Sequence, residues 1–162
     1  MQQSNTYVII FSIILTIILG GLLSGVSEVL GPRQKKAEEL DTKRQILGAV
    51  MNVDAIEKDQ ILEVYNNRIT SVVVNRNGEI VEKNEKGETI IAEKVNVGNQ
   101  YKAPLEKRLL PVFKFHKPGD QDNVEAYIVP VYGNGLWDNI WGFLALNTDL
   151  QTVKGIVFDH SA

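Results

Sequence analysis

The stretch VEAYIVPVYGNGLWDNIWGFLALNTDLQTVKGIVFDH, residues 124–160, decides the fold. It contains three apolar, β-branched runs, typical of strands, separated by a glycine-rich segment and by an Asn147-Thr148-Asp149 turn. The glycine-rich segment, YGNGLWDNIWGF, holds both tryptophans of the chain. It has two interpretations. One is a hairpin in which residues 133–135 take positive φ and the tryptophans are core or rim residues. The other is a platform that covers a flat aromatic ligand.

The sequence between residues 31 and 123 predicts helices and then further strands. Pro32 is expected to open an amphipathic helix over residues 33–51, and Asp54 to cap a second helix ending near Asn66. ITSVVVNRNGEIVEK, residues 69–83, predicts a hairpin around its Asn-Gly pair. RLLPVFKFH, residues 108–116, reads as an edge strand or a strand entry because of Pro111. The fold class is therefore α+β with a mostly antiparallel sheet.

The N-terminal segment predicts a membrane span. YVIIFSIILTIILGGLLSGV, residues 7–26, carries no charge, and its length suits a helix crossing a bilayer of roughly 30 Å. A secretory signal peptide is the alternative, but the positive n-region and cleavage site it needs are not evident. Gly21 and Gly25 have the spacing of helix contacts in membranes, or are simply small residues. Basic residues follow the span, so the positive-inside rule taken alone places the body in the cytoplasm.

Composition excludes several classes of function. The net charge of −3 offers no basic surface for nucleic acid, and the lack of cysteine excludes disulfides, thiolate nucleophiles and iron–sulfur ligation. His116 and His160 are the only histidines and have no partner at metal-ligand spacing, so we expect no metal site. Asp120 and Asp122 lie in a glycine-proline loop, where acidic residues serve turn geometry. No hydrolase or phosphate-transfer motif is present.

The C-terminal run resembles a known family. GNGLWDNIWGFLALNTDLQTVKGIVFDH is similar to a segment of NqrC, the covalent FMN-binding subunit of the sodium-translocating NADH:quinone oxidoreductase, with its G-x-G-L-W, G-F-x-A-L and D-x-x-T-V-x-G-I-x-F pattern. The N-terminal span and the juxtamembrane helix at residues 34–47 agree in layout. The matching positions are Gly133, Gly135, Leu136, Trp137, Gly142, Phe143, Ala145, Leu146, Asp149, Thr152, Val153, Gly155, Ile156 and Phe158.

The resemblance implies a role in an enzyme complex. Such subunits carry covalent FMN and relay electrons within a translocase of the cell inner membrane, which oxidises NADH, reduces ubiquinone and moves sodium ions. The partners implied are the other subunits of that complex and the membrane. The implied FMN surround includes Gly133, Gly135, Leu136 and Trp137. The implied layout is a tail over residues 1–6, a transmembrane helix over 7–30 and a periplasmic FMN-binding-type domain over 31–162. This location opposes the one from the positive-inside rule, and we follow the family.

One departure from the family pattern concerns the covalent FMN threonine. In the family it lies in an S-x-A-T motif beyond the last matching strand, and none of the threonines of this sequence has that context. We therefore expect this sequence to be the N-terminal part of such a subunit, without the FMN attachment site and without a complete active site. We also expect the strand at residues 152–158 to be unpaired, which would be an aggregation risk. The alternatives are RnfG, the flavin-binding subunit of the related Rnf electron-transport complex, and a membrane-tethered assembly domain without cofactor.

Overall fold

The computed structural model describes residues 5–160, and for His160 only the backbone. The chain divides into two compact units, residues 1–39 and residues 40–162. Most of the predicted tail over residues 1–6 lies outside the described part. Within it the elements are α1 (Asn5–Gly48), α2 (Lys58–Arg68), β1 (Ile69–Val74), η1 (Ala92–Lys94), α3 (Val97–Lys102), η2 (Leu105–Lys107), β2 (Leu110–Lys117), β3 (Asp120–Asn134), β4 (Asn139–Asn147) and β5 (Val153–His160).

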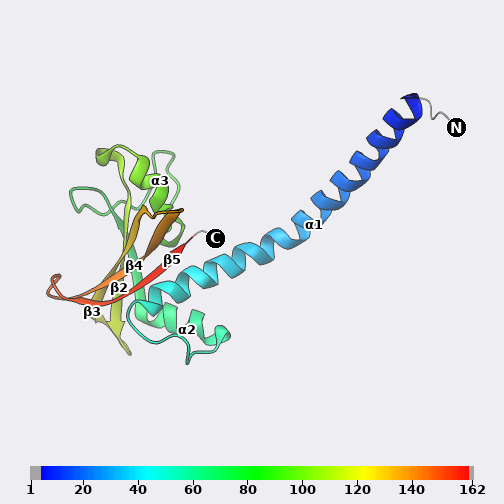
Figure 1. Cartoon of the computed structure of the whole chain (residues 1–162). Helices are drawn as coiled ribbons and strands as arrows, with labels where there is room; N and C mark the ends of the chain where they lie inside the picture. Colours follow the sequence, from blue (N-terminus) through cyan, green and yellow to red (C-terminus); the bar gives the residue numbers. More distant parts are fainter. Residues whose placement is uncertain (1–4, 161–162) are drawn as a thin grey trace. The chain divides into compact units, whose positions relative to one another are not determined.

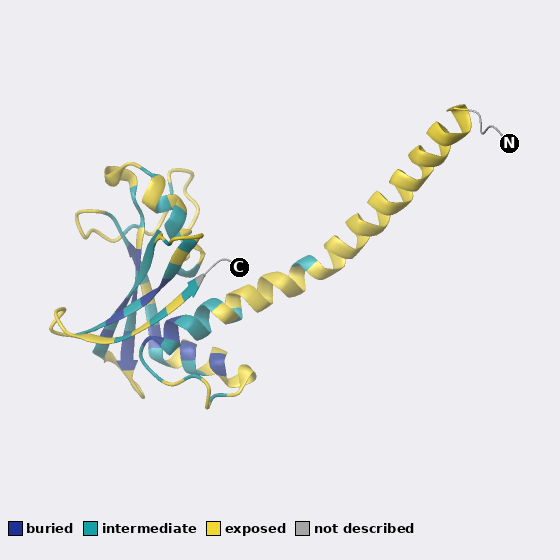
Figure 2. Ribbon diagram, in the orientation of Figure 1, coloured by how far each residue is buried: buried dark blue, intermediate teal, exposed yellow. Residues whose placement is uncertain are grey.

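The first unit is the N-terminal part of α1. This helix is long and apolar enough to span a membrane, and its side chains in residues 7–30 are exposed in the chain alone (Figure 2). Ser12 donates to the carbonyl of Val8 at 2.9 Å, and Thr16 to that of Ser12 at 2.8 Å. Both hydroxyls are thus satisfied within the helix, as a hydrocarbon environment requires. The predicted helix start at Pro32 is wrong, because α1 continues through this residue to Gly48.

The second unit is built on a five-stranded antiparallel sheet in the order β1-β2-β3-β4-β5. The α+β class and the three predicted C-terminal strands are confirmed. The expectation that the last of them is unpaired is wrong, because β5 pairs with β4 along its length. Pro111 is the second residue of β2, which confirms a strand entry, but β2 lies between β1 and β3 and is no edge strand. Proline is tolerated there because the pairing of β2 with β3 begins only at Phe113.

One face of the sheet carries the core. Phe113, Ile128 and Ala145 are aligned across β2, β3 and β4, and all three are buried. Figure 1 shows α2 and the last turns of α1 on one side of the sheet. They supply the buried side chains of Ile46, Leu47, Ile61 and Tyr65.

The second helix starts later than predicted. Its N-terminal cap is Glu57, and α2 begins at Lys58, so Asp54 does not cap it. Asp54 instead accepts a hydrogen bond from the Arg44 guanidinium at 3.1 Å. The prediction failed because an acidic residue followed by Glu three positions later fits a capping box, while an ion pair with α1 leaves no trace in local spacing.

Two five-residue turns of the same design lie between β1 and η1. In NRNGE, residues 75–79, the Asn75 side chain accepts from the backbone N–H groups of Asn77 and Glu79 and donates to the Glu79 carboxylate. In NEKGE, residues 84–88, the Asn84 side chain makes the same three hydrogen bonds, with the backbone N–H groups of Lys86 and Glu88 and with the Glu88 carboxylate. Gly78 and Gly87 have φ of 82° and 80°, as the turn chemistry predicts. After the first turn, an isolated bridge joins Val74 to Ile80 and the Val81 N–H donates to the Val73 carbonyl, so the predicted hairpin is short.

The end of α1 meets β5 at a close approach that needs glycine. A Cβ at Gly155 would collide with the carbonyl oxygen of Ala49, just after α1 ends. We therefore expect Gly155→Ala to lower the free energy of unfolding by about 1–3 kcal/mol, because either the helix end or the strand must shift. The measurement is denaturant unfolding of the full chain in detergent micelles.

Gly133→Ala is the matched control, because no heavy atom lies within 4 Å of its added Cβ and its φ is not positive. We expect it to leave the unfolding free energy nearly unchanged or slightly raised. Equal destabilisation by the two substitutions would contradict the steric explanation.

Candidate functional site

The predicted site residues lie in the connection between β3 and β4. Asn134 pairs with Asn139, and the Gly135 N–H donates to the Asp138 carbonyl at 2.9 Å, which closes a tight hairpin. The prediction of a strand connection is confirmed. The predicted positive φ at residues 133–135 is wrong, since none of the three has it. Gly135 is required for space instead: a Cβ there would lie 2.6 Å from the Asp138 carbonyl oxygen.

The two tryptophans have different environments. Trp141 is partly buried and packs against the core from β4. Leu136 and Trp137, at the tip of the hairpin, are 89% and 94% exposed. The core-or-rim interpretation therefore holds for Trp141, while Leu136 and Trp137 contribute almost nothing to packing of the chain alone. Their side chains are free to contact a ligand or another polypeptide.

The base of the hairpin is held by α3. Gly98 lies against the Tyr132 ring, where a Cβ would come within 2.9 Å of Cε2. Tyr101 packs on the same ring, with centroids 5.6 Å apart. The Arg108 guanidinium lies over Tyr101 and donates to its carbonyl at 2.7 Å. The exposed tip is thus carried on a fixed base, which is the usual arrangement for a binding loop on a rigid scaffold.

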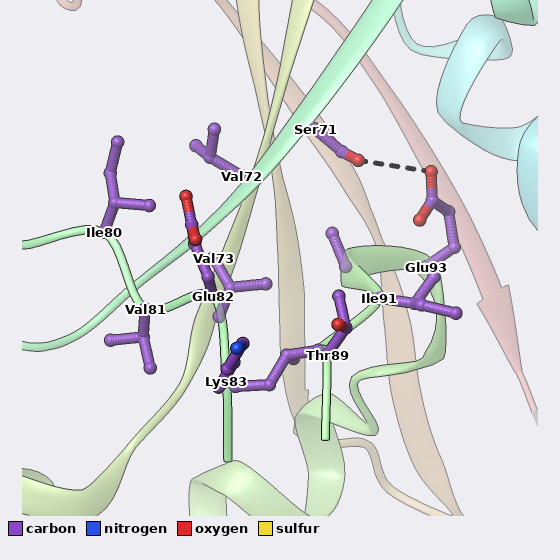
Figure 3. A pocket seen from close by; sticks show the side chains of 12 residues that line it. Ser71, Val72, Val73, Ile80, Val81, Glu82, Lys83, Thr89, Ile91 and Glu93 are labelled. Atoms are coloured by element: carbon purple, nitrogen blue, oxygen red, sulfur yellow. Dashed lines mark hydrogen bonds between the residues drawn. The ribbon is translucent and has the colours of Figure 1, made fainter. Parts of the chain in front are cut away.

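A shallow hollow of about 390 Å³ lies beside β1 (Figure 3). It forms where the chain folds back along the strand, with the Val81 N–H donating to the Val73 carbonyl at 2.8 Å. Its polar groups include the Glu93 carboxylate, which accepts from the Tyr65 hydroxyl at 2.7 Å and from the Ser71 hydroxyl at 3.4 Å. Sequence reasoning did not identify this hollow. It contains none of the predicted site residues, and its carboxylate is already engaged by two hydroxyls.

His116, the penultimate residue of β2, is buried. Its Nε2 lies 2.7 Å from the Thr70 hydroxyl, and its carbonyl accepts from Arg68 Nε. The Arg68 guanidinium also pairs with Glu125 at 3.1 Å and lies 4.1 Å from the centroid of the Phe115 ring. Arg68 thereby ties the end of α2 to β2 and β3. Between residues 5 and 160 no group of three acidic, histidine or cysteine residues is placed to hold a metal ion.

The predicted loop position of Asp120 and Asp122 is wrong, because both lie at the start of β3. The Asp120 carboxylate nevertheless serves the geometry of the turn before it. The Asp122 N–H donates to Asp120 Oδ1 at 3.1 Å, and Gly119 has a φ of 75°. Asp149 does the same in the β4–β5 turn, where its carboxylate accepts from the Thr152 hydroxyl and from two backbone N–H groups. These hydrogen bonds, led by the one from Thr152, lower the pKa of Asp149. No two of these three carboxylates form a catalytic pair.

No family model matches the chain. It is 29% identical to the Na(+)-translocating NADH-quinone reductase subunit NqrC of Vibrio campbellii, a match covering 89% of this chain and 59% of that protein. NqrC of Yersinia pestis is 24% identical, with 91% and 59% covered. The crystal structure of NqrC from Parabacteroides distasonis has a TM-score of 0.65 and 28% identity, over 82% of this chain and 59% of that one.

The predicted resemblance to NqrC is confirmed. The predicted fold class is confirmed with it, because a chain with this antiparallel sheet and its helices shares its fold with a solved NqrC over most of its length. The chain spans about three fifths of the length of the NqrC proteins it matches. Three of the four matching glycines also have a physical explanation: a Cβ at Gly135, Gly142 or Gly155 would come too close to a backbone carbonyl oxygen.

The Tyr65–Glu93 hydrogen bond beside the hollow makes the stability of the folded chain depend on pH. Burial, followed by the hydrogen bond to Glu93 and the charge of that carboxylate, raises the pKa of Tyr65 far above its usual value. In the unfolded chain the phenol loses its proton near pH 10, while the folded chain keeps it. Above about pH 10 the folded state therefore binds more protons, and its stability falls by about 1.4 kcal/mol per pH unit from this group.

We expect Tyr65→Phe to show two effects in denaturant unfolding of the full chain. At neutral pH it lowers the unfolding free energy by about 1–2 kcal/mol, because the Glu93 carboxylate loses its donor. Above about pH 10 the variant loses stability less steeply than the parent chain, since the group that titrates only on unfolding is gone. Parallel pH profiles for the two proteins would contradict the assignment.

Proposed function

We propose that the chain is part of an FMN-carrying subunit of a sodium-translocating NADH:quinone oxidoreductase. The observation that carries the proposal is the match to NqrC proteins over most of this chain, in sequence and in fold. A helix able to span a membrane, at the N-terminus, agrees with a component of a membrane complex. In this proposal the complex oxidises NADH, reduces ubiquinone and translocates sodium ions.

The Gly135-Leu136-Trp137 corner fits one side of a flavin surround. An almost fully exposed indole and an exposed leucine offer an apolar surface to one face of an isoalloxazine ring. Gly135, and Gly133 before it, leave the adjoining backbone without side chains. Bound FMN would supply the electron-accepting and electron-donating chemistry, and the chain would supply its position and surroundings. The corner provides no attachment for the phosphate, which in this proposal comes from polypeptide outside the present sequence.

The role in the complex predicts specific partners. When the chain is tagged and purified from native membranes in mild detergent, we expect the other subunits of a sodium-translocating NADH:quinone oxidoreductase to be recovered with it. The preparation should also show sodium-stimulated quinone reduction by NADH. Mass spectrometry identifies the subunits. Recovery of the chain with components of the Rnf complex would contradict the proposal and favour the Rnf subunit. Recovery of the chain with partners but without any flavin would contradict it and favour an assembly domain without cofactor.

The role of Trp137 is tested on the purified complex by flavin fluorescence, which a stacked indole quenches. We expect Trp137→Ala to increase the fluorescence of the flavin. We also expect it to weaken the contact between the chain and the flavin by about 0.5–1.5 kcal/mol. The equilibrium constant of a step that depends on this contact would then change by up to roughly ten-fold. Trp137→Phe keeps an aromatic face and should retain most of the quenching. Because Trp137 is exposed in the chain alone, neither substitution should change the unfolding free energy of the isolated chain. Unchanged fluorescence in both variants would remove Trp137 from the flavin surround.

We further propose that the second unit lies on the periplasmic side of the cell inner membrane. The chain has no cysteine, so single cysteines report location without background. In intact spheroplasts, we expect Gln151→Cys, in the exposed β4–β5 turn, to react with a membrane-impermeant maleimide. Asn5→Cys, at the other end of the span, should react only after permeabilisation. The reverse pattern would place the second unit in the cytoplasm, as the positive-inside rule alone indicates.

A further inference from the structure

The sheet has a second apolar face, opposite the core. Val129 of β3, Leu144 of β4 and Ile156 of β5 are register partners and form one row across three strands. Val131, Gly142 and Phe158 form the next row. Side chains alternate between faces along a strand, so both rows lie on the face opposite Ile128, Phe143 and Ala145. We call these two rows the second face. Strands that are apolar on both faces are typical of sheets covered on both sides.

All the helical elements that pack on the sheet do so on the core face. The end of α1 and α2 contribute Leu47 and Tyr65 to the core, and η1 contributes Ala92. The helix α3 contacts Tyr132, which is on the same face of β3 as Ile128. On the second face, Val129, Val131 and Leu144 are half-buried, while Ile156 and Phe158 are 46% and 60% exposed. Within residues 5–160, no helix covers these rows.

The edge strand β5 adjoins the second face and is open. It is last in the sheet order and pairs only with β4 among the described strands. An edge strand presents a row of backbone N–H and C=O groups, which another strand satisfies and a lipid or flavin surface does not. An apolar β-branched face beside an open edge therefore indicates a polypeptide occupant that pairs with the edge and covers the face.

The length of the relatives indicates which polypeptide this is. The matches cover 59–64% of the NqrC proteins while covering 89–97% of this chain, so about two fifths of each relative has no counterpart here. We propose that the second face and the β5 edge dock a polypeptide segment equivalent to that unmatched part of NqrC. This segment adds a strand to β5 and lays apolar side chains over Ile156 and Phe158. The inference rests on the resemblance to NqrC and not on the flavin.

The test uses the full chain in detergent micelles and hydrogen exchange of the β5 amides. The probes are separately produced segments: the unmatched parts of NqrC from Vibrio campbellii, Yersinia pestis and Parabacteroides distasonis. We expect at least one segment to slow exchange of the amides of residues 153–159 by about ten-fold or more, because paired edge groups exchange only on opening. Ile156→Asp should abolish this protection, since a carboxylate would be buried without a partner.

Ile91→Asp is the matched control. Ile91 has the same side chain and the same 46% exposure as Ile156, but it borders the hollow beside β1. It should leave the protection by the segment intact. Failure of all three segments to protect β5 in a folded chain would overturn the proposal. Protection that rises with the concentration of the chain itself, and not with a segment, would assign the face to a second copy and would also overturn it. Neither outcome bears on the flavin experiments above.

Discussion

The second unit depends on the packing of the end of α1 against the sheet. Ile46 and Leu47 are fully buried, Gly48 lies against the Val157 side chain, and the carbonyl of Ala49 occupies the space that a side chain at residue 155 would need. Gln45 adds a hydrogen bond to Asp159 at 2.9 Å. One helix thus begins as an uncharged segment suited to a bilayer and ends as part of a core. Its two parts are governed by different solvents, hydrocarbon and water, and the charged residues between them mark the change.

Residue patterns predicted the sheet well, because its signals are local. The β-branched runs and the turn residues place β3, β4 and β5 correctly, and an Asn-Gly pair marks the turn after β1. The helix boundaries were less predictable. Proline is common at the first turn of a helix, yet α1 runs through Pro32. The free-energy cost of a proline inside a helix is smaller than the stabilisation of the helix by the long apolar stretch before it and the core-facing stretch after it. Asp54 fits a cap in spacing but pairs with Arg44.

The candidate site shows what sequence can and cannot specify. The glycines and tryptophans of residues 132–143 correctly indicated a hairpin, while the contact of its tip with a flat aromatic ligand stays a prediction. The reason for Gly135 was misjudged, because its close approach to the Asp138 carbonyl has no local signature, whereas positive φ is the usual reason for glycine in turns. Buried His116 and its link through Arg68 to β2 and β3 depend on contacts between distant segments, and no spacing rule reveals them. The resemblance to NqrC, in contrast, was readable because it lies in contiguous residues.

The two turns at residues 75–79 and 84–88 have a consequence for how this part of the chain tolerates change. Each turn is held by hydrogen bonds within itself: one asparagine side chain accepts hydrogen bonds from two backbone N–H groups and donates one to the carboxylate of the glutamate at the end of the turn. Nothing from the sheet is needed to complete either set of bonds. The two turns therefore share one self-contained set of bonds, and the side chains between asparagine and glycine take no part in it, although Glu85 pairs with Lys107 at 3.7 Å. This makes them the natural places to graft an epitope or a spectroscopic probe.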